Sequence, residues 1–205
     1  MNLVSRATNI LTNPKTEWPR AAAEPASARE LLVGYALPLA LIPAILSVLF
    51  GLLFASMLGP YAGAGIVYLL VTAALGLVLG LVVLYVMSLI ANALAANFGG
   101  VSNPNGALKL LVYSGTAVWV ASIFSIIPVL GFLVVIAGYV YAAYLLYLGS
   151  TSVMQVPADR AGGYTAVVIL IWIGLWVVVG LVIGLITAAL FLGAAVTGGA
   201  GYMLR

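Results

Sequence analysis

The sequence contains no cysteine and no histidine, and it carries very little charge. Without cysteine the chain has no disulfide, thiolate metal site or cysteine nucleophile, and without histidine it lacks the commonest metal ligand and general base. Only 5% of its 205 residues are charged. Soluble domains carry about 25% charged residues, so this chain has too little charge to cover a surface that faces water.

The few charges also avoid the long apolar stretches. Those that precede the first such stretch are Arg6, Lys15, Glu17, Arg20, Glu24, Arg29 and Glu30. Asp159 is the only aspartate and lies in a predicted loop, which excludes a pair of aspartates within a membrane. We therefore expect a protein that is not an enzyme and that has no metal and no cofactor. A net charge of +3, spread this thinly, also argues against nucleic acid as a partner.

Apolar residues make up 65% of the chain, and the mean hydropathy is +1.29. A bilayer core about 30 Å thick is crossed by a helix of roughly 20 apolar residues. Runs of about that length or longer, with no charge in their interiors, cover residues 31–58, 65–94, 110–127, 130–149 and 165–196. The sequence predicts an all-α integral membrane protein, a bundle of five transmembrane helices. Only Pro128 and Val129 separate the third and fourth runs, where we expect a tight hairpin, the alternative being one long helix broken at the proline.

Basic residues in short loops predict which side of the membrane each end occupies. With the N-terminus inside, the cytoplasmic segments hold Arg6, Lys15, Arg20, Arg29, Lys109 and Arg160. The outer segments then hold only Arg205. The predicted organisation is a cytoplasmic segment at 1–30, a membrane domain at 31–196 and a short outer tail at 197–205.

The segment before the first run has the pattern of an amphipathic helix. Its apolar face consists of Leu3, Val4, Ala7, Ile10 and Leu11, with Arg6 at the border. Because Pro14 disfavours helix at Asn13, we expect the helix to stop there. We interpret it as an interfacial helix on the cytoplasmic leaflet with Trp18 as its anchor, the alternative being a frayed terminus. Contacts with lipid or with a partner are expected at Leu3, Arg6, Ile10, Lys15, Trp18, Lys109 and Arg160.

Small residues recur at helical spacing in several runs and predict close helix packing. They are Gly76, Gly80, Ser114, Ala117, Ala121, Ser125, Gly131, Gly138 and Ala142. Packing between spans is the expectation, with homodimerisation as the alternative. Asn92 and Asn97 form a candidate polar site near the end of the second span, where an amide either caps backbone groups or binds a ligand.

Several stretches together resemble bacterial members of the Yip-one domain family. They are NILTNPKTEWPRAAAEPAS, ANALAANFGG, NPNGALKLLVYSGTAVWV, IPVLG and YLLYLGSTSVMQVPADRAGGYT. The resemblance implies a five-span protein with a cytoplasmic N-terminus, and eukaryotic relatives are membrane adaptors that associate with Rab-type GTPases. The chain departs from the family pattern at Ala117 and Thr151, where proline is common, and at Ser122, where glycine is common.

These observations favour a membrane-organising or adaptor protein of the bacterial inner membrane. Its expected partners are membrane lipids and membrane or cytoplasmic proteins. The alternative is a passive channel or transporter for an uncharged or lipid-like solute, since no span carries an acidic residue for ion coupling.

Overall fold

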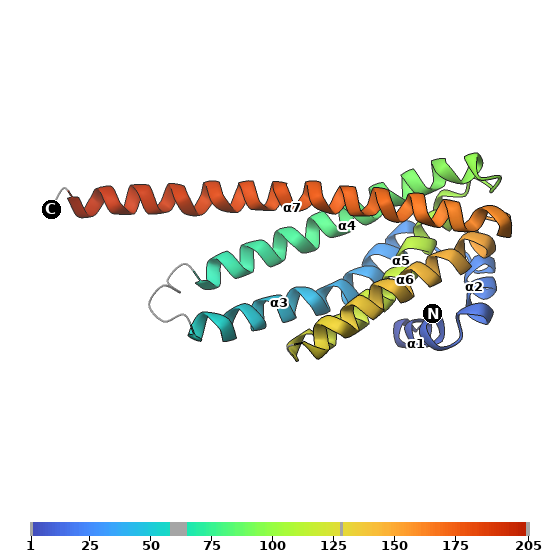
Figure 1. Cartoon of the computed structure of the whole chain (residues 1–205), viewed down its shortest axis with the longest axis horizontal. Helices are drawn as coiled ribbons and strands as arrows, with labels where there is room; N and C mark the ends of the chain where they lie inside the picture. Colours follow the sequence, from blue (N-terminus) through green and yellow to red (C-terminus); the bar gives the residue numbers. More distant parts are fainter. Residues whose placement is uncertain (1, 58–64, 128, 204–205) are drawn as a thin grey trace.

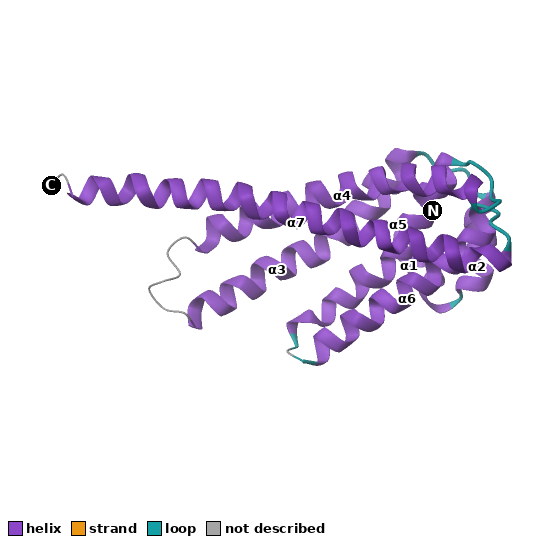
Figure 2. Ribbon diagram, turned by 45° about the horizontal axis from the view of Figure 1, so that its top comes forward, coloured by secondary structure: helices purple, strands orange, loops and turns teal. Residues whose placement is uncertain are grey.

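The computed structural model of the chain describes residues 2–57, 65–127 and 129–203, and side chains over 2–53, 66–127 and 129–189. Within these ranges the regular secondary structure consists of helices, which are joined by short loops (Figure 2). The elements are α1 (Leu3–Thr12), α2 (Pro14–Ala23), η1 (Glu30–Ala36), α3 (Leu37–Met57), α4 (Gly65–Asn97), α5 (Pro104–Ala121), η3 (Ser122–Ile126), α6 (Leu130–Val153) and α7 (Ala158–Met203).

Five helical segments of the described chain are long and apolar enough to cross a membrane, which confirms the predicted fold class. They cover Glu30–Leu53, Ile66–Asn97, Pro104–Ile126, Leu130–Val153 and Ala158–Ala189. The segment built on α5 lies at the centre, because 67% of its most apolar window is buried, against 22% or less in the other four. Helices α3, α4 and α6 pack around α5, and α7 packs on α4 and α6 (Figure 1).

The third and fourth spans form a tight hairpin, as predicted. Helix α5 ends at Ala121, a 3-10 turn covers Ser122–Ile126, and α6 starts at Leu130 in the reverse direction (Figure 1). A Cβ atom on Gly131 would collide with the backbone carbonyl of Phe124, so the two ends of the turn touch. Val129 has φ of +65°, a strained value for a β-branched residue.

Small residues line the seam between α5 and α6. A Cβ atom on Gly138 would lie 2.6 Å from the Cβ of Ala121 and 3.2 Å from the carbonyl oxygen of Ala117. Glycine at this position therefore lets the two backbones approach closely. In the same hairpin Ser114 is buried, whereas Ser125 and Ala142 are half-buried. Gly76 and Gly80 of α4 make no such helix contact: a Cβ on Gly76 would have no neighbour within 4 Å, and one on Gly80 would meet a ring carbon of Trp176 at 3.5 Å.

The first span begins with an unusual wide turn. Ser27 and Glu30 form a reciprocal capping box, in which the Glu30 carboxylate accepts from the Ser27 backbone N–H at 2.8 Å and the Ser27 hydroxyl accepts from the Glu30 N–H at 3.2 Å. The chain then takes π-helical form over Glu30–Ala36 before α3. Pro38 follows directly, and its ring has no N–H to donate and clashes with the preceding turn of a regular α-helix. The wide turn thus lies where the proline disturbs the helix.

Four helices extend beyond the predicted spans: α4 by three residues, α6 by four, and α5 and α7 by more. Helix α5 begins at Pro104, not near Leu110, because the Asn103 side chain caps it by accepting from the Gly106 N–H at 2.9 Å and proline fits the first helical position. Helix α7 runs from Ala158 to Met203, so the predicted outer tail is helical up to Met203. At 1.5 Å per residue its 46 residues span about 69 Å.

Candidate functional site

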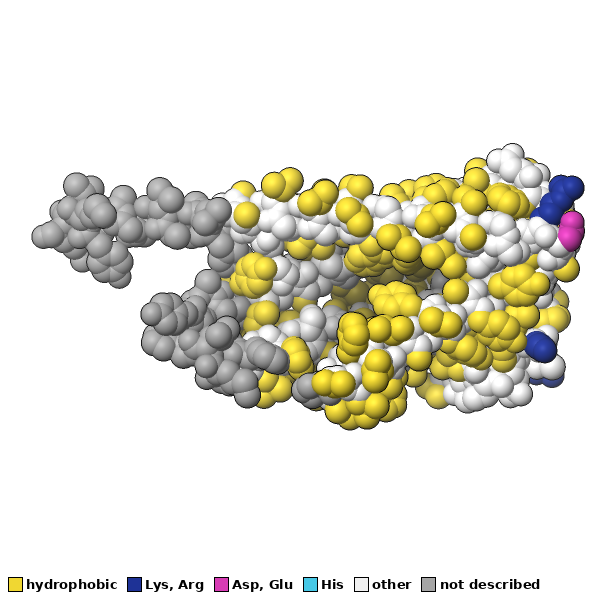
Figure 3. Space-filling view, viewed as in Figure 1, with side chains coloured by type: hydrophobic (Ala, Val, Ile, Leu, Met, Phe, Trp, Pro, Cys, Tyr) yellow, Lys and Arg dark blue, Asp and Glu magenta, His cyan; other side chains and the backbone are white. Residues whose placement is uncertain are grey.

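The charged residues of the described chain gather at one end of the bundle, which we call the charged end. Figure 3 shows basic and acidic side chains there, while the surface along the helices is apolar. Helices α1 and α2, η1 and the first turns of α5 and α7 form this end (Figure 1). It is where the sequence concentrates groups that could bind a polar partner.

Helices α1 and α2, together called the cap (residues 3–23), fold back onto α5 and α6. Trp18 is completely buried, with its ring centroid 6.2 Å from that of Tyr113. A Cβ atom on Gly149 of α6 would lie 2.7 Å from the Trp18 ring, so the indole sits directly on a glycine. The Tyr141 hydroxyl donates to the carbonyl oxygen of Leu11 at 2.7 Å. The cap is therefore a packed part of the fold.

Arg6 of α1 forms the ionic centre of this packing. Only 1% of it is exposed, and its guanidinium forms ion pairs with the carboxylates of Glu17 and Glu24. The guanidinium carbon also lies 5.5 Å from the ring centroid of Tyr113, a cation–π contact with α5. Glu17 is 4% exposed, so removing Arg6 would leave a buried carboxylate without its main partner.

Lys109 of α5 binds the end of α2. Its ammonium group donates to the carbonyl oxygen of Ala21 at 2.9 Å and to that of Glu24. The last carbonyls of a helix lack partners within the helix and carry partial negative charge, so a cation there is favourable. Lys109 is 6% exposed and joins the cap to the central helix of the bundle.

Aromatic side chains extend this network into the first span. The ring of Tyr35 meets that of Tyr113 edge-on at 5.0 Å between centroids, and the hydroxyls of Tyr35 and Thr116 share a hydrogen bond of 2.9 Å. Tyr113 thus touches Arg6, Trp18 and Tyr35, which belong to three different elements. The cap, α5 and the start of the first span meet at this one ring.

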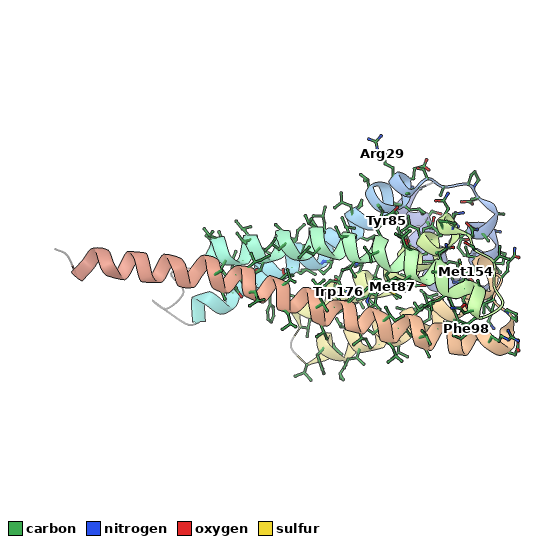
Figure 4. The ribbon with its side chains drawn as sticks, turned by 90° about the horizontal axis from the view of Figure 1, so that it is seen from above. Arg29, Tyr85, Met87, Phe98, Met154 and Trp176 are labelled. Atoms are coloured by element: carbon green, nitrogen blue, oxygen red, sulfur yellow. The ribbon has the colours of Figure 1, made fainter. Side chains whose placement is uncertain are left out.

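The remaining loops of the charged end are fixed by backbone hydrogen bonds. The Asn92 side chain accepts from the Asn103 N–H at 2.7 Å, which is the capping alternative considered for this residue. Val101 N–H donates to the Met154 carbonyl at 2.8 Å, which joins the loop after α4 to the loop after α6. Phe98 meets Tyr164 edge-on at 5.8 Å, and Figure 4 shows Phe98 and Met154 together at this end. Asn97, the last residue of α4, is exposed.

Several of the predicted contact residues lie on the outer surface of this end. Lys15 is exposed, the side chain of Arg160 is 59% exposed, and Leu3 is half-buried. A shallow depression of about 520 Å³ lies between the α2–η1 linker and the start of α5, with Glu24, Glu30 and Lys109 in its lining. Within the residues whose side chains are described, no three potential metal-binding side chains come together.

Other predicted contact residues lie inside the protein. Trp18 and Ile10 are fully buried and Arg6 nearly so, which differs from the expected interfacial helix with Trp18 as a lipid anchor. The reason is that Ala7 and Ile10 of α1 and the Trp18 ring belong to the core formed with α5 and α6, whereas Val4 of the predicted apolar face is 66% exposed. Lys109 likewise points at α2 and does not reach outward to headgroups.

Sequence reasoning missed Glu17, Glu24 and Tyr113 as members of the site. Their roles depend on contacts between segments far apart in the chain, which helical periodicity does not reveal. One signal was present: Asn103 followed by Pro104 is typical of a helix start, and it places Lys109 more than a turn inside the helix.

Comparison with known proteins gives a family and no individual relative. Neither the curated proteins nor the solved structures include a match to this chain. The model of the Yip1 domain matches residues 8–180, from the middle of α1 to the middle of α7. The match covers the cap from residue 8 onward, its binding surface on α5 and α6, and four complete spans. The chain belongs to the Yip1 domain family of multi-pass membrane proteins.

Proposed function

We propose that this protein is a non-enzymatic adaptor or scaffold of the bacterial inner membrane, which presents its charged end to protein partners in the cytoplasm. The observation that carries the proposal is the docked cap. Isolated helices of ten residues are marginal in water, but here Arg6, Trp18 and Lys109 hold two such helices on the membrane bundle. A partner would meet a surface that is already folded, which lowers the entropic cost of binding.

The outward side of the cap has the composition of a docking surface. Val4 is 66% exposed and the side chain of Arg20 is 71% exposed, with Lys15 between them in sequence. The cap thus carries both an exposed apolar residue and exposed cations, which suits an acidic protein surface with an apolar contact point. The adaptor role implied by the family resemblance agrees with this arrangement.

The same charges support the proposed orientation. The basic residues expected on the inner side lie on the elements that form the charged end, as do the acidic residues of the described chain. Loops rich in lysine and arginine face the cytoplasm in bacterial membranes. We therefore place the charged end, with the N-terminus, inside the cell.

Photo-crosslinking in living cells tests the docking surface. A benzophenone amino acid is placed at Val4 or at Arg20, and in a matched control at Leu185, which is 71% exposed on the apolar surface of α7. We expect discrete protein adducts from the two cap positions and none from Leu185. The double charge reversal of Lys15→Glu with Arg20→Glu should remove the Val4 adduct, because an acidic partner would be repelled. Both side chains are exposed, so the cap itself should stay docked.

Equal adduct patterns from Val4 and Leu185 would contradict the adaptor proposal. The channel alternative predicts a different result, solute flux in liposomes that contain only the purified protein. Bulky replacement of Ser114 or Gly138 would block such a pathway if it ran along the α5–α6 seam. Gly138, however, packs directly on Ala117 and Ala121. Flux that survives the pair of cap reversals would favour the channel.

A further inference from the structure

A cavity of about 410 Å³ lies among the spans, away from the charged end. It is bounded by α3, α4, α5 and α7, and Figure 3 shows the surface hollowed between α7 and the helices below it. Its lining comes from the middle of the first span, Ala40 to Ser47, and from Thr72 to Leu84 of α4. The cavity therefore lies at the depth of acyl chains. Its volume is within the range of about 300–1,000 Å³ that is usual for small-molecule sites.

Small residues of α4 and the tryptophans of α5 and α7 shape this cavity. Gly76 leaves open space, because a Cβ atom there would have no neighbour within 4 Å. Trp119 of α5 and Trp172 and Trp176 of α7 also line the cavity. Trp176 lies on α7 near Gly80 of α4, and Figure 4 shows it at mid-length of the bundle.

The hydroxyl groups in the lining are already bonded to their own helices. The Ser47 hydroxyl donates to the Ala44 carbonyl at 2.8 Å. The Thr72 hydroxyl donates to the Tyr68 carbonyl at 2.8 Å and lies 3.1 Å from the Leu69 carbonyl. Neither donor is free for a polar solute. The remaining lining consists of alanine, glycine, proline, leucine and tryptophan side chains, so the chemistry of the cavity is apolar.

We propose that this cavity is a binding site for one acyl chain of a membrane phospholipid. The cavity is partly open, and it lies among the apolar spans whose outer surface is the interface of this chain with the bilayer. An apolar hollow excludes water, and its walls lose dispersion contacts if nothing fills it. Acyl chains are the apolar material present at that depth. A chain seated there would pack α7 against the α3–α4 hairpin, and the inference holds whether or not the charged end docks a protein.

Tryptophan quenching by a brominated phospholipid tests the site. The probe is a phosphatidylcholine with bromines at the middle of one acyl chain, titrated into the purified full-length protein in detergent micelles. Trp119, Trp172 and Trp176 line the cavity, whereas Trp18 is fully buried in the cap and gives a constant background. We expect quenching that saturates at a single phospholipid per chain.

The variant Gly76→Leu fills the cavity with a side chain and should remove the saturable quenching. Gly180→Leu is the matched control, because a Cβ atom on Gly180 also has no neighbour within 4 Å and Gly180 faces outward from α7. It should behave as the wild type. Ala44→Leu, on the α3 side of the cavity, is a second filling variant and should reproduce the loss if Gly76→Leu fails to fold.

Two results would overturn the proposal. Quenching that rises in proportion to lipid without saturating, equally in wild type and in both filling variants, would mean that the tryptophans meet only bulk lipid. The molecular mass of the protein in micelles is the second measurement. If the wild type has the mass of two chains and Gly76→Leu has the mass of one, a second copy of the protein fills the cavity. Failure of either kind leaves the photo-crosslinking test at Val4 unaffected, so the two proposals can fall separately.

Discussion

At the residue scale, Arg6 joins the two cap helices to each other and to the central helix α5. It pairs with Glu17 in α2 and with Glu24 after α2, and it lies over Tyr113 in α5. Such a buried pair gives little net stability compared with apolar side chains of the same size, but losing one partner is costly. The value of Arg6 therefore lies in fixing how the two cap helices meet.

The substitution Arg6→Met should destabilise the cap by about 3–5 kcal/mol, because it leaves Glu17 buried without its main cation. The measurement is thermal unfolding in detergent micelles, followed by tryptophan fluorescence. Arg20→Met is the matched control, since its side chain is 71% exposed and lies 3.9 Å from Glu17, and it should cost less than about 1 kcal/mol. Equal losses in the two variants would show that Arg6 is not buried among the carboxylates.

A second prediction concerns Lys109. The change Lys109→Met removes the cation from the carbonyls at the end of α2, a contribution of about 1.5–3 kcal/mol for a charged hydrogen bond. Opening of the cap should then become more frequent, so trypsin should cut after Lys15 or Arg20 at least about tenfold faster. Arg160→Met alters an exposed cation of the same end and should leave the rate unchanged. An unchanged rate in Lys109→Met would disprove the contact with α2.

At the element scale, the α5–α6 hairpin follows most directly from the sequence. Its turn was predicted from the two residues between apolar runs, and its seam from small residues spaced along both helices. Gly138 lies where the two helices approach each other closely, whereas Gly180 on α7 has open space around it. The same residue type therefore has opposite roles, which spacing alone does not distinguish.

Replacing Gly138 with leucine should split this hairpin. The new Cβ would fall 2.6 Å from the Cβ of Ala121, and overpacking of this kind costs about 1–3 kcal/mol or more. Gly180→Leu introduces the same side chain on an open surface and should change stability little. The apparent melting temperatures of both variants in one detergent provide the comparison. A Gly138→Leu protein as stable as wild type would mean that the helices are farther apart than described.

Hydropathy predicted the five spans because a long apolar helix is most stable in the hydrocarbon core of a bilayer. The docking of the cap could not be predicted in that way. Ile10 lies on the predicted apolar face, but whether that face meets lipid or protein depends on how the cap packs on Tyr113 and Gly149, which are distant in the chain. Amphipathic periodicity reports that a face is apolar and does not report what covers it.

At the scale of the whole molecule, the charged side chains visible in Figure 3 lie at one end of the described chain. The native sequence has no cysteine, so single cysteines introduced at exposed positions can be labelled without background. Lys15→Cys, Ser102→Cys and Asp159→Cys sample three elements of the charged end. We expect a membrane-impermeant maleimide to label all three in inside-out vesicles and none in intact cells. Labelling of all three in intact cells would show the opposite orientation, and labelling of only some of them would contradict the claim that the three lie on one side of the membrane.

The central structural claim is that the cap is part of the bundle and forms its charged end. Hydrogen–deuterium exchange measured by mass spectrometry on residues 3–23 tests it most directly, because undocked helices of ten residues would exchange quickly. The account predicts slow exchange in wild type and in Arg20→Met, and fast exchange confined to this segment in Arg6→Met and Lys109→Met. Fast exchange in wild type, or slow exchange in all four proteins, would contradict it.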